Sequence, residues 1–181
     1  MNKEYLIIGA SYSITNNSMG SGGGEADFHC SFNAITTKTQ FRPQRNTPKP
    51  IVQGPQTAIV VGPTGEEIHT DEHGRVKIQF HWDRYSKGDD TSSCWIRVSH
   101  PWAGKEWGMV TIPRVGHEVV VSFLEGDPDW PLITGSIYNG DTKPPYALPA
   151  NKTQSGIKSR TYKGGNSNFN EFRFEDKKGS E

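Results

Sequence analysis

Between residues 56 and 138 the sequence repeats one pattern, a short run of alternating apolar and polar residues followed by a cluster of Gly, Pro and Asp. In residues 75–82, for example, every second position from Val76 to Trp82 is apolar. This alternation gives a strand one buried face and one solvated face, as in an antiparallel sheet. Because turn residues recur about every ten positions, we predict an all-β chain without a helix of three turns.

The strands predicted for this region are short and evenly spaced. They cover residues 56–61, 75–82, 94–99, 109–112 and 117–124, with residues 132–138 as a sixth. Such a set fits a small barrel or a sandwich. The count favours a five- to six-stranded antiparallel barrel of the oligonucleotide/oligosaccharide-binding (OB) type.

The segments on either side of this region lack a core of their own. Residues 5–14 and 27–35 resemble two strands separated by a glycine-rich stretch, residues 20–24, and a proline-rich connector follows. A last strand is predicted at residues 169–174. An isolated pair of strands is marginal in water, and the last strand has no partner in its own sequence. We therefore expect the tail either to be disordered or to pair with copies of itself in neighbouring chains.

Composition excludes some functions. The chain of 181 residues carries 20 Lys and Arg and 20 Asp and Glu, so its formal net charge is zero. Binding to nucleic acid or to an anionic membrane depends on surplus positive charge, which is missing here. No signal-peptide pattern opens the sequence, so we expect a cytoplasmic protein. Its cysteines, Cys30 and Cys94, lie in alternating runs and are predicted to be free, buried thiols.

Several motifs occur in a fixed order. The most specific comprises Gly126, Asp127, Pro128, Asp129, Trp130, Pro131, Gly135 and Tyr138. Residues 71–77, 95–99 and 112–119 precede it, and residues 156–159 and 170–179 follow. Over roughly residues 50–181 this order resembles the VgrG proteins, the trimeric spike proteins of the bacterial type VI secretion system, which are related to contractile-phage tail spikes.

The residues of the main motif also have a physical explanation that needs no chemistry. Pro128 fixes φ near −65° in a tight turn, and Asp127 is able to cap that turn. Trp130 and Pro131 then begin a strand. Gly135 inside this strand would allow the bend or the close approach that a small barrel requires.

The resemblance implies a division of the chain into four parts. Residues 1–50 would be the end of the hub domain and a linker, and residues 51–140 the OB barrel. Residues 141–160 would be a second linker, and residues 161–181 the start of a trimeric β-helix needle. Within this needle segment, the candidate trimer contacts are Phe169, Phe172 and Phe174.

The resemblance also implies a non-catalytic function. The chain would form a homotrimer that carries effectors and a tip protein through a target envelope. Its partners would be a tail-tube protein at the hub end, a PAAR-like tip protein at the needle end, and secreted effectors. It would be assembled in the cytoplasm and then injected, and it would need no cofactor.

Three catalytic or metal-binding interpretations are weaker. His69 and His73 would be neighbours on a helix, but on a strand they would lie about 13 Å apart, too far to share an ion. Cys94 resembles a protease nucleophile with His100 or His117 as base, yet it opens a strand-like run, not a helix. The carboxylates of Glu125, Asp127 and Asp129 crowd one turn and are better explained as a solvated loop. We expect no catalytic residue and no metal ligand.

One alternative stays open, an OB module that binds single-stranded nucleic acid or an oligosaccharide. Such barrels stack bases on aromatic side chains above a basic groove. Candidate stacking residues are Trp82, Tyr85, Trp95, Trp102 and Trp107, and candidate cations are Arg75, Lys77, Arg84, Lys87 and Arg97. The neutral net charge argues against nucleic acid, and the fold alone does not determine function.

Overall fold

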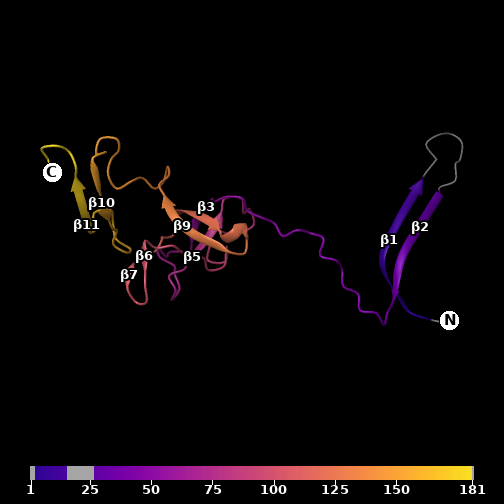
Figure 1. Cartoon of the computed structure of the whole chain (residues 1–181). Helices are drawn as coiled ribbons and strands as arrows, with labels where there is room; N and C mark the ends of the chain where they lie inside the picture. The colour runs from indigo at the N-terminus through magenta and orange to yellow at the C-terminus, as the bar shows by residue number, and fades with distance from the viewer. Residues whose placement is uncertain (1–2, 16–26, 181) are drawn as a thin grey trace, which may run out of the picture. The chain divides into compact units, whose positions relative to one another are not determined.

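The structure is a computed structural model that describes residues 3–15 and 27–180 (Figure 1). The chain divides into two units, Met1–Lys49 and Pro50–Glu181, which are described separately. The described residues contain no helix of the length and hydropathy that crossing a lipid bilayer requires. The all-β prediction is confirmed.

The first unit contains an antiparallel hairpin of β1 (Tyr5–Thr15) and β2 (Asp27–Thr36), as predicted. Nearly all of its strand side chains are exposed, because a two-stranded ribbon has no second layer to cover either face. Cys30 is therefore exposed, and the prediction of a buried thiol is wrong. The glycine-rich stretch 20–24 lies outside the described residues.

The second unit is built on a curled five-stranded sheet with the strand order β4-β3-β8-β9-β5. The strands are β3 (Gln56–Val61), β4 (Lys77–Phe80), β5 (Arg97–Val98), β8 (Glu118–Phe123) and β9 (Pro131–Ile137). An isolated bridge between Val76 and Ile96 links the outer strands β4 and β5, so the sheet curls back on itself. The OB-type prediction is confirmed with one correction: β5 runs parallel to β9, and the sheet is not wholly antiparallel.

The core lies inside this sheet and is made of aliphatic side chains. Among the described residues it comprises Ala58, Val60, Val61, Val76, Ile78, Ile96, Val119, Val121 and Ile133. In β8 the buried positions are Val119 and Val121, as period-two alternation requires. The apolar face of residues 75–82 ends before Trp82, which is 66% exposed. Cys94 is exposed as well, because it precedes the bridge at Ile96, so its predicted burial is also wrong.

The predicted strand at residues 109–112 does not join the barrel. Only Met109 is in a strand, β7 (Gly108–Met109), which pairs with β6 (Trp102–Ala103) in a separate ribbon. The rings of Trp102 and Trp107 meet edge to face in this ribbon, with centroids 5.4 Å apart. Residues 110–112 are not strand-paired, although Ile112 packs on the core.

The last strand has a partner in its own chain. β11 (Glu171–Glu175) pairs antiparallel with β10 (Gln154–Lys158), from Gln154 opposite Glu175 to Lys158 opposite Glu171. The expectation that this strand must borrow a neighbour or be disordered is therefore wrong. β10 was not predicted, because Ile157 is the only large apolar residue in it and no alternation is visible.

Candidate assembly surface

The turn between β8 and β9 contains the most specific motif, and its first residue requires glycine. Gly126 has φ +73°, in the left-handed region that favours glycine. A Cβ atom there would lie 2.7 Å from Cγ2 of Ile51 and 3.0 Å from the carbonyl oxygen of Val52. The N–H of Val52 donates to the carbonyl of Gly126 at 2.8 Å. The motif thus fixes the segment that leads into the barrel.

Hydrogen bonds within the turn explain the role of Asp127. The Asp127 carboxylate accepts the Asp129 N–H at 3.0 Å, and the Trp130 N–H donates to the Asp127 carbonyl at 3.0 Å. An aspartate that bonds to the backbone two residues ahead is a common turn-forming device. Asp127 therefore acts as a turn former, which agrees with the interpretation as a loop. Trp130 and Tyr138, at the two ends of β9, are 60% and 62% exposed.

Gly135 lies beside a bulge, not at a close contact. Val120 is opposite Gly135 and Val121 is opposite Ile133, so Thr134 is the extra residue of β9. A bulge of this kind bends the strand that contains it. A Cβ atom on Gly135 would meet nothing within 4 Å, so the close-approach explanation does not apply.

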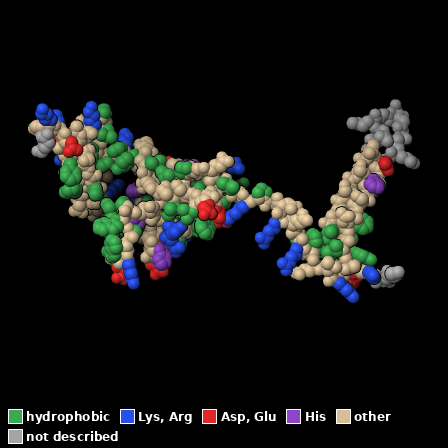
Figure 2. All heavy atoms as spheres, viewed as in Figure 1, with side chains coloured by type: hydrophobic (Ala, Val, Ile, Leu, Met, Phe, Trp, Pro, Cys, Tyr) green, Lys and Arg blue, Asp and Glu red, His purple; other side chains and the backbone are tan. Residues whose placement is uncertain are grey.

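The β10–β11 hairpin exposes an apolar face. Phe172 and Phe174 project from the same side of β11, with ring centroids 4.8 Å apart, and Ile157 lies opposite Phe172 in β10. Their exposed fractions are 63%, 54% and 61%. Apolar side chains are visible on this hairpin in Figure 2. We call Phe172 and Phe174 the aromatic strip, with the aliphatic Ile157 beside it.

Phe169, the third candidate contact, is not part of β11. It lies in the preceding loop, where the ammonium nitrogen of Lys158 sits 3.9 Å from the centroid of its ring. Such a cation–π contact partly covers the ring, and Phe169 is 41% exposed. The structure thus brings two of the three predicted phenylalanines together and places the third at the end of the hairpin.

The other face of the hairpin is polar and more tightly packed. A Cβ atom on Gly156 would lie 2.3 Å from the Phe172 carbonyl oxygen and 2.6 Å from the Tyr146 hydroxyl, so only glycine fits there. The Glu175 carboxylate accepts hydrogen bonds from Thr153 and Gln154 at 2.5 and 3.1 Å. These bonds hold the pKa of Glu175 below its usual value. The two faces therefore differ. The polar face is held by contacts within the chain, and the apolar face is exposed to solvent.

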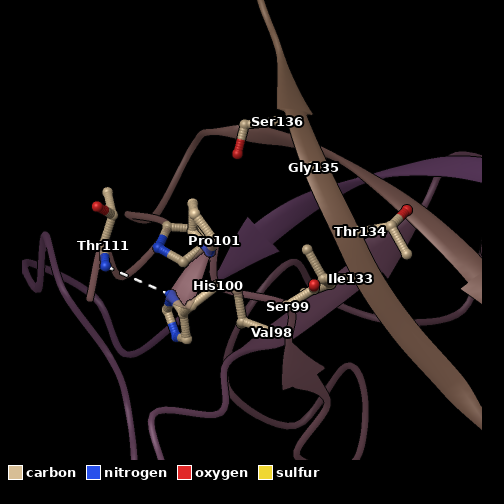
Figure 3. Close-up of a pocket in the computed structure, with 10 residues that line it drawn as sticks. Val98, Ser99, His100, Pro101, Thr111, Ile133, Thr134, Gly135 and Ser136 are labelled. Carbon is tan, nitrogen blue, oxygen red and sulfur yellow. Dashed lines mark hydrogen bonds between the residues drawn. The ribbon is translucent and has the colours of Figure 1, made fainter. Parts of the chain in front are cut away.

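A shallow groove of about 360 Å³ lies beside the bulge of β9 (Figure 3). The Nδ1 of His100 accepts the Thr111 N–H there at 3.4 Å. Among the ten residues that line it are Ser99, Thr134 and Ser136, but no carboxylate or thiol. The groove does not assemble a nucleophile, a base and an acid.

The sequence analysis considered His69 and His73 as metal ligands and Cys94 as a nucleophile. The ring of His69 packs on Trp95, with centroids 4.8 Å apart, and His73 lies 3.6 Å from the Glu72 carboxylate at the surface. Cys94 is in irregular backbone before β5, not at a helix start. Within residues 3–15 and 27–180 there is no group of three or more His, Cys, Asp or Glu side chains that could hold a metal ion.

The cations proposed for nucleic-acid binding are partly engaged within the chain. Arg75 forms an ion pair with Asp71 at 2.6 Å. The Lys77 ammonium donates to the Asp90 carbonyl at 2.5 Å and lies 5.0 Å from the Trp95 ring centroid. Side chains bound in this way do not form a free basic groove.

Comparison with known proteins agrees with this geometry. Residues 56–138 match the family model of the type VI secretion system/phage-baseplate injector OB domain. The chain is 58% identical, over 99% of its length, to the type VI secretion system spike protein VgrG1c of Pseudomonas aeruginosa, and 57% identical to VgrG1a of that organism. It is 51% identical, over 88% of its length, to the actin cross-linking toxin VgrG1 of Vibrio cholerae. The chain spans 25%, 28% and 14% of these relatives.

Proposed function

The chain belongs to the VgrG family of type VI secretion spike proteins, and from this premise we propose that it is a non-catalytic segment of a trimeric spike. The observation that carries the proposal is the aromatic strip, which lies open on the next hairpin of the chain after the injector-type barrel. Clustered exposed aromatic side chains mark protein interaction sites. Three copies packed around a common axis would cover this strip.

In this proposal the four parts of the chain have mechanical roles. Residues 1–50 end the hub that meets the tail tube, the barrel transmits force, and residues 161–181 begin the needle that leads to a tip protein. Effectors travel with the assembled spike from the cytoplasm into a target envelope. Phe172 and Phe174 would be central trimer contacts, with Phe169 at the periphery of the interface.

The mass of the particle in solution tests the proposal. Light scattering at tens of micromolar should give three times the chain mass of 20.1 kDa. Phe172→Asp should lower the mass, because an unpaired charge buried in an interface is costly. The circular dichroism of the barrel should not change, since Phe172 is not in its core.

A matched control is Tyr85→Asp, which places the same charge on an aromatic residue that is 90% exposed and outside the hairpin. This variant should keep the mass of the unmodified chain. A single 20.1 kDa species for the unmodified chain would refute the trimer.

A further inference from the structure

The loop between β10 and β11 is bound to the barrel of the same chain. The Tyr162 hydroxyl donates to the Glu66 carboxylate at 2.6 Å, and the Lys163 N–H donates to the Glu67 carboxylate at 3.1 Å. The Arg114 guanidinium donates to the Arg160 carbonyl at 2.7 Å. Three successive hydrogen bonds thus join residues 160–163 to barrel loops that are distant in sequence.

The barrel residues of this contact are also bonded to one another. Arg114 lies 3.5 Å from the Glu67 carboxylate, and the Val115 N–H donates to the Glu67 carbonyl at 3.0 Å. The loop after β3 and the loop before β8 are therefore bonded to each other. Together they offer two carboxylates and one guanidinium to residues 160–163. The hydrogen bond from Tyr162, followed by the charge of Lys163, lowers the pKa of Glu66, which keeps this carboxylate ionised.

The backbone of the loop is shaped for the contact. Lys163 has φ +53°, a conformation that residues with a side chain rarely adopt. The tight turn is closed by the Gly164 N–H, which donates to the Thr161 carbonyl at 3.0 Å. This conformation accompanies the hydrogen bond from the Lys163 N–H to Glu67.

We infer that Glu66, Glu67 and Arg114 form a clasp on Arg160, Tyr162 and Lys163 that holds the β10–β11 hairpin folded within one chain. A two-stranded hairpin is marginally stable alone, and the aromatic strip stays exposed, with no second layer of described residues packed over it. Anchoring its loop to the barrel removes the freedom of that loop in the unassembled chain. The hairpin is then formed before copies associate and is not made by exchange of strands.

The clasp deepens the proposed function, on which it rests only for the role of β11 at the start of the needle. The two can be tested apart. Hydrogen–deuterium exchange reports on the pairing of residues 154–158 with residues 171–175, and light scattering on the same samples reports on association.

The experiment measures exchange in the unmodified chain over a hundredfold dilution, and in Tyr162→Phe and Glu66→Ala. Protection of the hairpin amides should be the same at every concentration, including those at which the mass is that of one chain. Each variant should speed exchange in the hairpin several-fold, because each removes the same hydrogen bond. Exchange in β3 and β8 should stay unchanged, which shows that the barrel is folded.

Tyr85→Phe is the control, since Tyr85 is 90% exposed and distant in sequence from the clasp residues. It should leave hairpin exchange unaltered. The inference is overturned if protection appears only as the mass rises, because the strands would then pair between chains. It is also overturned if both clasp variants exchange like the unmodified chain. A protected hairpin in a chain that stays monomeric would support the clasp and refute the trimer.

Discussion

At Gly126 two separate constraints act on one residue. Its φ is positive, and the space that a side chain would need is filled by Ile51 and Val52. Gly135, nine positions later in the same motif, has neither constraint. A shared sequence motif therefore combines a glycine that the fold requires with one whose side chain the fold would accommodate.

Gly126→Ala should destabilise the barrel by about 1–3 kcal/mol, the usual cost of a residue held in a sparsely populated conformation. Displacement of Val52 adds to this cost, because its N–H bonds to the carbonyl of residue 126. Urea unfolding followed by tryptophan fluorescence measures the change. Gly140→Ala is the control: its φ is not positive and a Cβ atom there meets nothing within 4 Å, so its midpoint should stay within error.

Glu118 gives the barrel a pH dependence of definite sign. The hydrogen bond from Asn139, followed by one from Thr57, lowers the pKa of this carboxyl below 4.5. The unfolded chain therefore binds more protons than the folded chain in this pH range. The stabilisation that Glu118 contributes is fully present above pH 4.5. It is lost as the pH falls toward the lower pKa of the folded state.

Glu118→Gln should therefore make the loss of stability between pH 5 and pH 3 shallower. The amide oxygen of glutamine still accepts from Asn139, so the main change is the removal of a titrating group. Urea midpoints measured across this range check the slope. Glu72→Gln, at a side chain that is 86% exposed, should retain the full slope. Equal slopes for both variants would contradict the role given to Glu118.

At the scale of the elements, the strands that could be predicted are those whose apolar run and flanking turn residues lie in one short stretch of sequence. β3 was predicted to the residue, because its apolar run is bounded by turn residues on both sides. Each end of β8 and β9 was predicted to within one residue. Burial of Val119, Val121 and Ile133 follows directly from their alternation.

The elements that could not be predicted depend on contacts between distant segments. β10 exists because residues 154–158 meet β11, and no periodicity in the segment itself indicates this. β5 has two residues in place of the predicted six, because its pairing with β9 extends only from Arg97 to Val98. Of the candidate surface, the phenylalanines of β11 were identified from sequence, whereas Ile157 and the clasp were not.

The β10–β11 pairing should depend on Gly156. In Gly156→Ala, the new methyl group would meet the Phe172 carbonyl of the partner strand, so the strands must separate. We expect lost amide protection in residues 154–158 and 171–175 and, in the proposed trimer, a lower mass. Barrel amides should keep their protection, because Gly156 touches none of the core residues. Gly140→Ala again serves as the control. An intact hairpin in Gly156→Ala would contradict the packing described here.

At the scale of the whole molecule, charge separates the two functions that an OB barrel suggests. Twenty cationic and twenty anionic side chains cancel, and Arg75 and Lys77 are already held by Asp71 and Asp90. Nucleic-acid affinity comes largely from neutralised phosphates and the release of their counterions. A chain with no net positive charge, and with Arg75 and Lys77 already held, has little of this free energy to gain.

Titration of a labelled single-stranded oligonucleotide should therefore show no saturation at protein concentrations up to about 10 μM in moderate salt, within the non-specific range. Lowering the salt should change the signal little, because few phosphates would be neutralised. Trp82→Ala separates stacking from charge, since Trp82 is uncharged and 66% exposed, and its indole N–H donates to Gln56 at 2.9 Å. Tight binding that weakens steeply with salt and is lost in Trp82→Ala would favour the nucleic-acid module over the spike segment.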